Sequence, residues 1–422
     1  MTQFLTRRES LQGGAILGGG LLAGCLGDDD ADDDGQIPET DDDTDNDPSD
    51  DDDTDDQETP GSEGMVYAFG PSRIAVIDPT EGEIVDEITD GIDDDSWGDT
   101  QIVSDYSAIY AIRESPSQVV VIDTASRSIA AEIDIGPGPT HVYHPNEEEI
   151  WAHGDDEGAF YVIDTALHEV AEIVQSGMDD EGHGKLLYHS DFGDTGYATN
   201  VNDPGLPVID LAAYERTDFI ELTDEGGTHY KAYSPENGCL YAELSGPNET
   251  AVLDPDTHDT IDTLPYAGGM YLSPDESTMA FIDGDDVIFI NVTDTEHEEL
   301  ASVSIEGGGP DVVRYDEAGD GTLYAFTANT MDNKAAVIDV DAGQVIDELD
   351  VGDIVRPEDA HHLHRSGVSG DQYFITPADA DATVTIIDMS EQAVAATVAV
   401  EEGVDTVQYV GDSGTGYSGK LR

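Results

Sequence analysis

The chain of 422 residues is extremely acidic: 96 aspartate and glutamate residues oppose 14 lysine and arginine residues, which gives a formal net charge of −82. Such a chain repels itself in dilute buffer, and molar salt relieves the repulsion because it shortens the screening length to about 3 Å. The charge therefore indicates adaptation to high salt. It also argues against nucleic-acid binding, which requires patches of lysine and arginine. An acidic face that recruits a basic partner or calcium remains an alternative, because the acid excess runs along the whole chain.

The first residues carry the pattern of an export signal. Arg7-Arg8 precede an apolar, glycine-rich stretch from Gly13 to Gly24, which ends in Leu-Ala-Gly before Cys25. This pattern resembles a twin-arginine signal with a lipobox, in which the signal is cut before a cysteine that is then acylated. The resemblance implies that residues 1–24 are the signal and that a lipid on Cys25 anchors the protein to the outer face of the cell membrane. No run of about 18 apolar residues follows, so we expect no membrane-spanning helix.

Residues 25–64 are expected to form an acidic, disordered tether. From residue 28 onward this segment consists almost entirely of Asp, Thr, Glu, Pro, Gly and Ser. It cannot bury enough apolar surface to offset its ordering entropy, and its like charges repel one another. The folded domain is therefore predicted to span residues 65–422.

This domain repeats one strand pattern eight times. Each unit contains an apolar strand that ends in a polar anchor, and the anchors recur every 37 to 49 residues: Asp78, Asp123, Asp164, Asp210, Asp254, Asn291, Asp339 and Asp388. That period is typical of propeller blades with four strands each. The apolar residues alternate with period two, and no stretch carries a helical stripe. The sequence therefore predicts an all-β fold.

The two ends of the repeat array are complementary. The array begins with three strands of a blade, at 66–68, 73–78 and 84–88, and it finishes with an unpaired strand near 406–410. If the last strand joined the first three, the ring would close without exposed edges. We expect a closed β-propeller of about eight four-stranded blades. Seven blades would result if the irregular region 276–299 were partitioned differently.

Two resemblances follow from these units. Residues 118–133 and 334–349 are similar to the YVTN-type propeller repeats of secreted and surface proteins. The starts of the inner strands carry Pro139-Thr140-His141 with His144, Gly182-His183-Gly184 and Gly227-Thr228-His229. This series resembles the secreted zinc metallochaperone propellers that deliver metal to the binding protein of an ABC importer. The acidic N-terminal segment differs from the histidine-rich segment of that family.

The histidines lead to a metal-site hypothesis. Inner strands line the central channel of a propeller, so His141, His183 and His229 are expected at one corner, with His361 at the corresponding position of blade eight. Imidazole nitrogens suit zinc, and they also suit copper and nickel. A carboxylate such as Asp99 or Glu181 would complete a tetrahedral site.

Other interpretations stay open for these and the remaining residues. The histidines of this corner could instead cap inner strands by hydrogen bonding, or act on a substrate. His361-His362 with His364 form a second candidate set of ligands. We expect His153 and His168 at the surface and Cys239 packed between blades.

The sequence thus favours a lipid-anchored, extracellular, monomeric metal-binding propeller that captures or delivers zinc. Its partners would be the metal ion, the membrane lipid and the binding protein of a metal importer. A propeller that only binds other surface proteins is the alternative. An enzyme is less favoured, because the chain has no catalytic motif of a known class.

Overall fold

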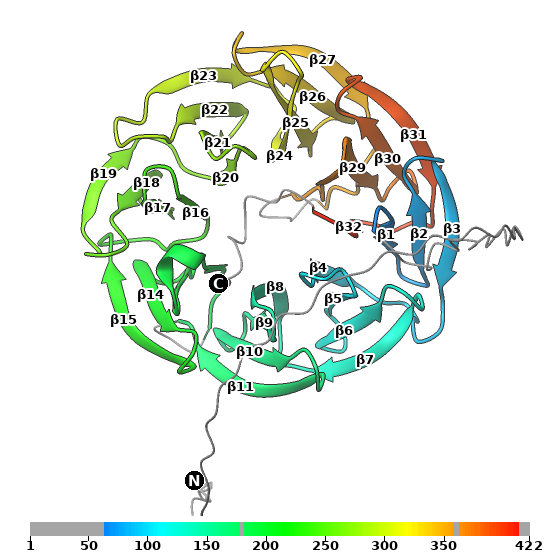
Figure 1. Ribbon diagram of the computed structural model, residues 1–422, viewed down its shortest axis with the longest axis horizontal. Helices are drawn as coiled ribbons and strands as arrows, with labels where there is room; N and C mark the ends of the chain where they lie inside the picture. The colour runs from blue at the N-terminus through cyan, green and yellow to red at the C-terminus, as the bar shows by residue number, and fades with distance from the viewer. Residues whose placement is uncertain (1–62, 178–180, 358–362, 413–422) are drawn as a thin grey trace, which may run out of the picture. The chain divides into compact units, whose positions relative to one another are not determined.

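The computed structural model describes residues 63–177, 181–357 and 363–412. These residues form eight four-stranded antiparallel sheets arranged as blades around a ring (Figure 1). The predicted all-β propeller with eight blades is therefore confirmed, and seven blades are excluded. Among the described residues the only helical element is a single 3-10 turn, Ser190–Phe192. No helix in this part of the chain is long and apolar enough to cross a membrane.

The first four blades are built from consecutive strands, apart from the C-terminal strand that joins the first blade. Blade 1 contains β32 (Thr406–Tyr409), β1 (Val66–Phe69), β2 (Ile74–Asp78) and β3 (Glu83–Ile88). Blade 2 contains β4 (Trp97–Ile102), β5 (Ala108–Arg113), β6 (Gln118–Asp123) and β7 (Ser128–Asp134). Blade 3 contains β8 (Pro139–Asn146), β9 (Glu149–Gly154), β10 (Ala159–Asp164) and β11 (Glu169–Gln175). Blade 4 contains β12 (Leu186–Leu187), β13 (Thr195–Ala198), β14 (Gly205–Asp210) and β15 (Glu215–Glu221).

The last four blades follow in the same order. Blade 5 contains β16 (Lys231–Ser234), β17 (Cys239–Leu244), β18 (Glu249–Leu253) and β19 (Thr260–Leu264). Blade 6 contains β20 (Gly269–Leu272), β21 (Thr278–Asp283), β22 (Asp286–Asn291) and β23 (Glu299–Ser304). Blade 7 contains β24 (Pro310–Glu317), β25 (Leu323–Asn329), β26 (Lys334–Asp339) and β27 (Gln344–Asp350). Blade 8 contains β28 (Val368–Gly370), β29 (Tyr373–Ala378), β30 (Thr383–Asp388) and β31 (Ala393–Ala399).

The ring closes through blade 1, as the sequence predicts. β32 pairs antiparallel with β1, so that Val66 lies opposite Tyr409 and Phe69 opposite Thr406. In Figure 1 the red C-terminal strand lies beside the blue N-terminal strands. This closure gives blade 1 the same four strands as the other seven blades.

The repeated polar anchor has a local physical cause. The Asp164 carboxylate accepts hydrogen bonds from the backbone N–H groups of Ala166 and Leu167, and other anchors make the same contacts. These bonds form an Asx turn that starts the hairpin to the outer strand. The register of that hairpin shifts one residue before the anchor in all eight blades, which is a β-bulge. The anchor and the bulge together explain why this signature recurs.

The hydrophobic core lies between the blades rather than within any one of them. Eight separate apolar clusters fill the eight spaces between neighbouring blades. Cys239 belongs to the cluster between blades 5 and 6 and is 2% exposed, so its predicted packing role is confirmed. Inner strands such as β4, β8 and β16 lie nearest the centre in Figure 1, while β7, β11 and β19 lie at the rim. This arrangement directs residues from several blades at one central channel.

Candidate metal centre

The predicted site residues line one cavity in the centre of the ring. His141 lies in β8, His183 and His229 lie just before β12 and β16, and Asp99 lies in β4. All four contribute to a cavity of about 470 Å³ whose wall also includes residues of blades 1, 6, 7 and 8. His361 lies outside the described residues, as do Arg7, Arg8 and Cys25, so those predictions stay untested.

Three histidines converge on one point of this cavity. The Nε2 atoms of His141 and His183 are 3.1 Å apart, and those of His183 and His229 are 3.0 Å apart. The candidate ligand atoms of all three residues lie within 4.8 Å of one another. Nitrogens bound to zinc at about 2.0–2.1 Å in a tetrahedral site lie roughly 3.3 Å apart. The three imidazoles therefore fit a common metal ion without a large rearrangement. We name His141, His183 and His229 the histidine triad.

Carboxylates hold the opposite nitrogen of two of the three rings, and a third carboxylate lies farther from His229. Asp99 Oδ2 lies 2.5 Å from His141 Nδ1, and Asp155 Oδ2 lies 2.7 Å from His183 Nδ1. Glu243 Oε2 lies 4.0 Å from Nδ1 of His229. Such carboxylate–histidine pairs fix the tautomer and the orientation of imidazoles that bind metals. Asp99 was expected to be a ligand itself, but its carboxylate contacts the Nδ1 side of His141, away from the other two histidines.

Asp155 is the supporting residue that sequence reasoning missed. Its Oδ1 accepts hydrogen bonds from Thr140 Oγ1 at 2.7 Å and from His153 Nδ1 at 2.8 Å, while its Oδ2 contacts His183. In the sequence Asp155 belongs to a turn between two strands of blade 3, where an acidic residue is ordinary. Glu181, which the sequence suggested as a possible fourth metal ligand, is exposed and does not belong to the group of candidate ligands around the histidine triad. Only the packing of the blade 3 turn beside blade 4 identifies Asp155.

The same turn overturns the prediction for His153. This residue was expected at the surface, but it is fully buried. Its Nδ1 bonds to Asp155, its Nε2 lies 3.0 Å from Ser176 Oγ, and its ring packs edge-on against Phe160. The prediction was wrong because Ser176, in the connection that follows β11, packs against the end of β9 and covers it.

Charge and burial set the protonation of two members of the triad, His141 and His229. Burial, followed by the positive charge of Lys185, lowers the pKa of His141 to about 3, although Asp99 opposes the shift. Burial and Lys185 also lower the pKa of His229. Burial alone would raise the pKa of Asp99, but the charge and hydrogen bond of His141 lower it to about 2. At neutral pH these histidines are therefore neutral, which is the form that binds metals, and Asp99 is ionised.

Asp99 and Asp155 decide which ring nitrogens of His141 and His183 face the common point. Asp155 is ionised as well, because its hydrogen bonds to His153 and His183 outweigh burial and lower its pKa. An ionised carboxylate only accepts hydrogen bonds, so Nδ1 of His141 and of His183 carries the proton. Nε2 of the neutral His141 is then an acceptor, and it lies 3.1 Å from Nε2 of His183. The two Nε2 atoms are placed so that one metal ion could bind both.

Lys185 is a second group that sequence reasoning missed. Its Nζ lies 3.1 Å from His141 Nε2 and 5.7 Å from the centre of the Tyr230 ring. The side chain is 7% exposed, and burial lowers its pKa. Its position two residues after His183 is the signal that would have found it, because alternate residues of an extended segment point to the same side.

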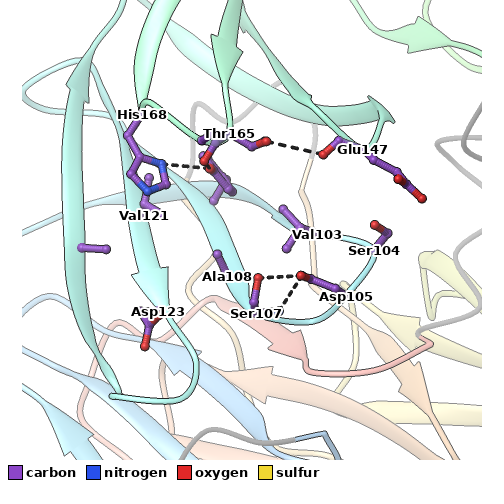
Figure 2. A pocket seen from close by; sticks show the side chains of 13 residues that line it. Val103, Ser104, Asp105, Ser107, Ala108, Val121, Asp123, Glu147, Thr165 and His168 are labelled. Atoms are coloured by element: carbon purple, nitrogen blue, oxygen red, sulfur yellow. Dashed lines mark hydrogen bonds between the residues drawn. The ribbon is translucent and has the colours of Figure 1, made fainter.

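The other histidines lie apart from the triad. His364 lines the central cavity, and its Nδ1 lies 3.4 Å from Asp311 Oδ2. His361 and His362, the other two members of the second candidate set of ligands, lie outside the described residues. His168 was expected at the surface and is half-buried between blades 2 and 3, where its Nδ1 lies 3.1 Å from the Tyr110 hydroxyl. A second cavity lies between blades 2 and 3. Figure 2 shows His168 on its wall, with Asp105 and Ser107 across from it. Among the described residues it is the one histidine that lines this cavity, so no second triad forms there.

Comparisons with known proteins add information on the fold alone. No family model and no curated protein matches the chain. The YVTN-type resemblance therefore stays a prediction. The solved structure of dihydro-heme d1 dehydrogenase NirN in complex with DHE is similar over 83% of this chain and 76% of that chain, with a TM-score of 0.65 and 12% identity. AztD from Citrobacter koseri is similar over 85% of this chain and 98% of that chain, with a TM-score of 0.61 and 15% identity. Its apo structure gives a TM-score of 0.60 at 14% identity, over 81% and 96% of the two chains. At these identities the likeness concerns architecture.

Proposed function

We propose that this protein is a metal-binding propeller that captures or delivers zinc in the manner of a metallochaperone. The observation that carries the proposal is the convergence of three imidazoles on one point of the central cavity. The resemblance of the inner-strand histidines to zinc metallochaperone propellers supports the same conclusion. The overall similarity to AztD is consistent with it at the level of the fold.

The site has the properties that a metal carrier needs. Three imidazole nitrogens suit zinc, and they leave a fourth position open in a tetrahedral geometry. The side chains of His183 and His229 are 32% and 19% exposed, so the metal would enter and leave through the channel. Asp99 and Asp155 would hold the rings in the orientation that binds metal and fix the tautomer whose Nε2 carries the free lone pair.

Metal content and zinc titration test the proposal. The full chain would be purified in molar salt, analysed for metals, stripped with a chelator and titrated with zinc against a chromogenic chelator. We expect one zinc per chain, lost in His141→Ala, His183→Ala and His229→Ala. His258→Asn is a matched control, because His258 lies outside the cavity and its left-handed backbone (φ 61°) tolerates asparagine. Absence of zinc uptake by the wild-type chain would overturn the proposal.

We also propose that the protein acts outside the cell on a lipid anchor, as Arg7, Arg8 and Cys25 predict. The sequence pattern of the first 25 residues supports this location. Cys25→Ser is expected to release the protein from the membrane fraction, and replacement of Arg7 and Arg8 by lysine is expected to block export. A Cys25→Ser variant that stays in the membrane fraction would contradict the anchor.

A further inference from the structure

Positive charge in this acidic protein gathers at the central channel. Only 14 residues of the chain are lysine or arginine, yet four of them, Lys185, Lys231, Arg314 and Arg365, lie in or beside the channel. All four are buried, with exposures of 7%, 1%, 5% and 2%. A buried lysine is costly, because its ammonium loses hydration, and it is seldom placed without a partner.

The two arginines are set apart from the triad. Arg365 has a structural role between blades, and Arg314 lies across the cavity. The Arg365 guanidinium donates to the carbonyl groups of Val351, Gly352 and Asn329, and so joins blades 7 and 8. Arg314 lies over the Tyr271 ring of blade 6 and donates to the carbonyl of Val313. The lysines belong to the blades that carry the triad.

Lys185 contacts the atom that a metal would bind. Its Nζ lies 3.1 Å from His141 Nε2, the atom that faces His183. A metal ion bound to that lone pair would take this acceptor from Lys185. A buried donor that loses an acceptor costs free energy unless another acceptor replaces it. Lys231 lies nearby, since its Nζ is 5.7 Å from the centre of the Tyr143 ring, which lies beside His141, and burial lowers its pKa well below the usual value.

Among the histidine, cysteine and acidic side chains of the described residues, none joins the triad as a fourth ligand. Among the described residues the converging group contains the three histidines alone, and Asp99 and Asp155 contact them from the Nδ1 side. An N–H donor next to an open coordination position favours a ligand that accepts hydrogen bonds and carries negative charge.

We propose that a small monoanion completes the metal site, bound to the metal at the fourth position and hydrogen-bonded to Lys185. The anion is of the class of a halide, bicarbonate or a simple carboxylate. It replaces His141 Nε2 as the acceptor of Lys185 and offsets the positive charge of the metal. This inference rests on the proposed function, because it requires the triad to bind a metal.

Cobalt spectroscopy separates the two proposals. The stripped full chain would be loaded with Co²⁺ in a molar salt of a weakly coordinating anion, and its visible spectrum recorded while azide is added as the probe. We expect a saturable shift of the Co²⁺ bands with azide, and competition by chloride, bicarbonate and acetate would rank the natural ligand.

Substitutions of Lys185 then test its role. Lys185→Met is expected to bind Co²⁺ but to weaken azide binding about tenfold or more, the value of one charge-assisted hydrogen bond. Lys185→Arg keeps the donors and is expected to retain most of the azide response, which also guards against a failure of the methionine variant to fold. Lys334→Met is the matched control, because Lys334 pairs with Asp350 at the surface.

The outcomes are distinct. A wild-type chain that takes up no Co²⁺ would overturn both proposals. Uptake of Co²⁺ without any azide shift, or equal azide affinity in the wild type and Lys185→Met, would overturn the anion site and leave the metal site standing.

Discussion

Replacement of Asp155 by asparagine should weaken metal binding without removing any ligand. In the wild type this carboxylate accepts hydrogen bonds from His183, His153 and Thr140, at 2.7, 2.8 and 2.7 Å. An amide of the same shape has one oxygen and one NH₂ group, so it cannot accept from donors on both sides. Either His183 or His153 would then lose its acceptor. Because His183 turns more easily than the fully buried His153, the loss falls on the metal ligand.

The size of the effect follows from that single contact. A hydrogen bond to a charged group contributes about 1.5–3 kcal/mol, and about 1.4 kcal/mol corresponds to a tenfold change in an equilibrium constant. Loss of outer-shell partners of this kind typically lowers metal affinity 10- to 100-fold. We therefore expect Asp155→Asn to raise the zinc dissociation constant by roughly 10- to 100-fold.

A competition titration with a chromogenic chelator in molar salt measures this change. Asp156→Asn is the matched control, because Asp156 is the exposed neighbour in the same turn and changes the net charge equally. Thr140→Val removes one hydrogen bond to Asp155 but keeps the carboxylate, and it is expected to have a smaller effect. Equal zinc affinity in Asp155→Asn and Asp156→Asn would refute the argument that Asp155 positions His183.

Three further predictions concern stability. The net charge of −82 should make the thermal unfolding temperature fall steeply as salt is lowered from about 3 M to 0.1 M, because the screening length grows to about 10 Å. An unchanged unfolding midpoint, measured by circular dichroism, would count against salt adaptation. Burial and Lys185 lower the pKa of His141 from 6.5 to about 3, so between these values the unfolded chain takes up a proton that the folded chain does not. In the metal-free protein His141 should therefore account for a loss of roughly 2 kcal/mol between pH 7 and 5, and His141→Gln should lack this part of the pH dependence in denaturant titrations. Tyr241→Phe removes the hydroxyl that contacts His297 Nε2 at 2.9 Å between blades 5 and 6, and it should lower the free energy of unfolding by about 1–3 kcal/mol, whereas no loss would show that this contact is dispensable.

The Tyr241 contact belongs to a repeated contact between neighbouring blades. The Tyr110 hydroxyl lies near His168, and the Tyr197 hydroxyl lies 3.4 Å from His258 Nε2. In each case a tyrosine of a second strand reaches the outer hairpin of the next blade. His168, His258 and His297 therefore share a contact between neighbouring blades that the triad does not make.

The sequence by itself determined the repeat, its period and the closure of the ring. These features depend on local chemistry: alternating apolar residues form strands, and an aspartate at the end of the third strand forms an Asx turn with the next backbone amides. Because every blade repeats this chemistry, the sequence also predicted that His141, His183 and His229 would share one corner. Their equivalence within the repeat was enough to place them together.

Only the tertiary structure decided what surrounds the triad. Asp155 and His153 lie in a turn of blade 3 that packs beside blade 4, and no periodicity relates a turn to the neighbouring blade. Asp99 shares the corner but contacts Nδ1 of His141, because the direction of a side chain depends on packing across blades and not on its register. The burial that keeps His141 neutral, and the contact of Lys185 with it, likewise result from the closed ring around the channel.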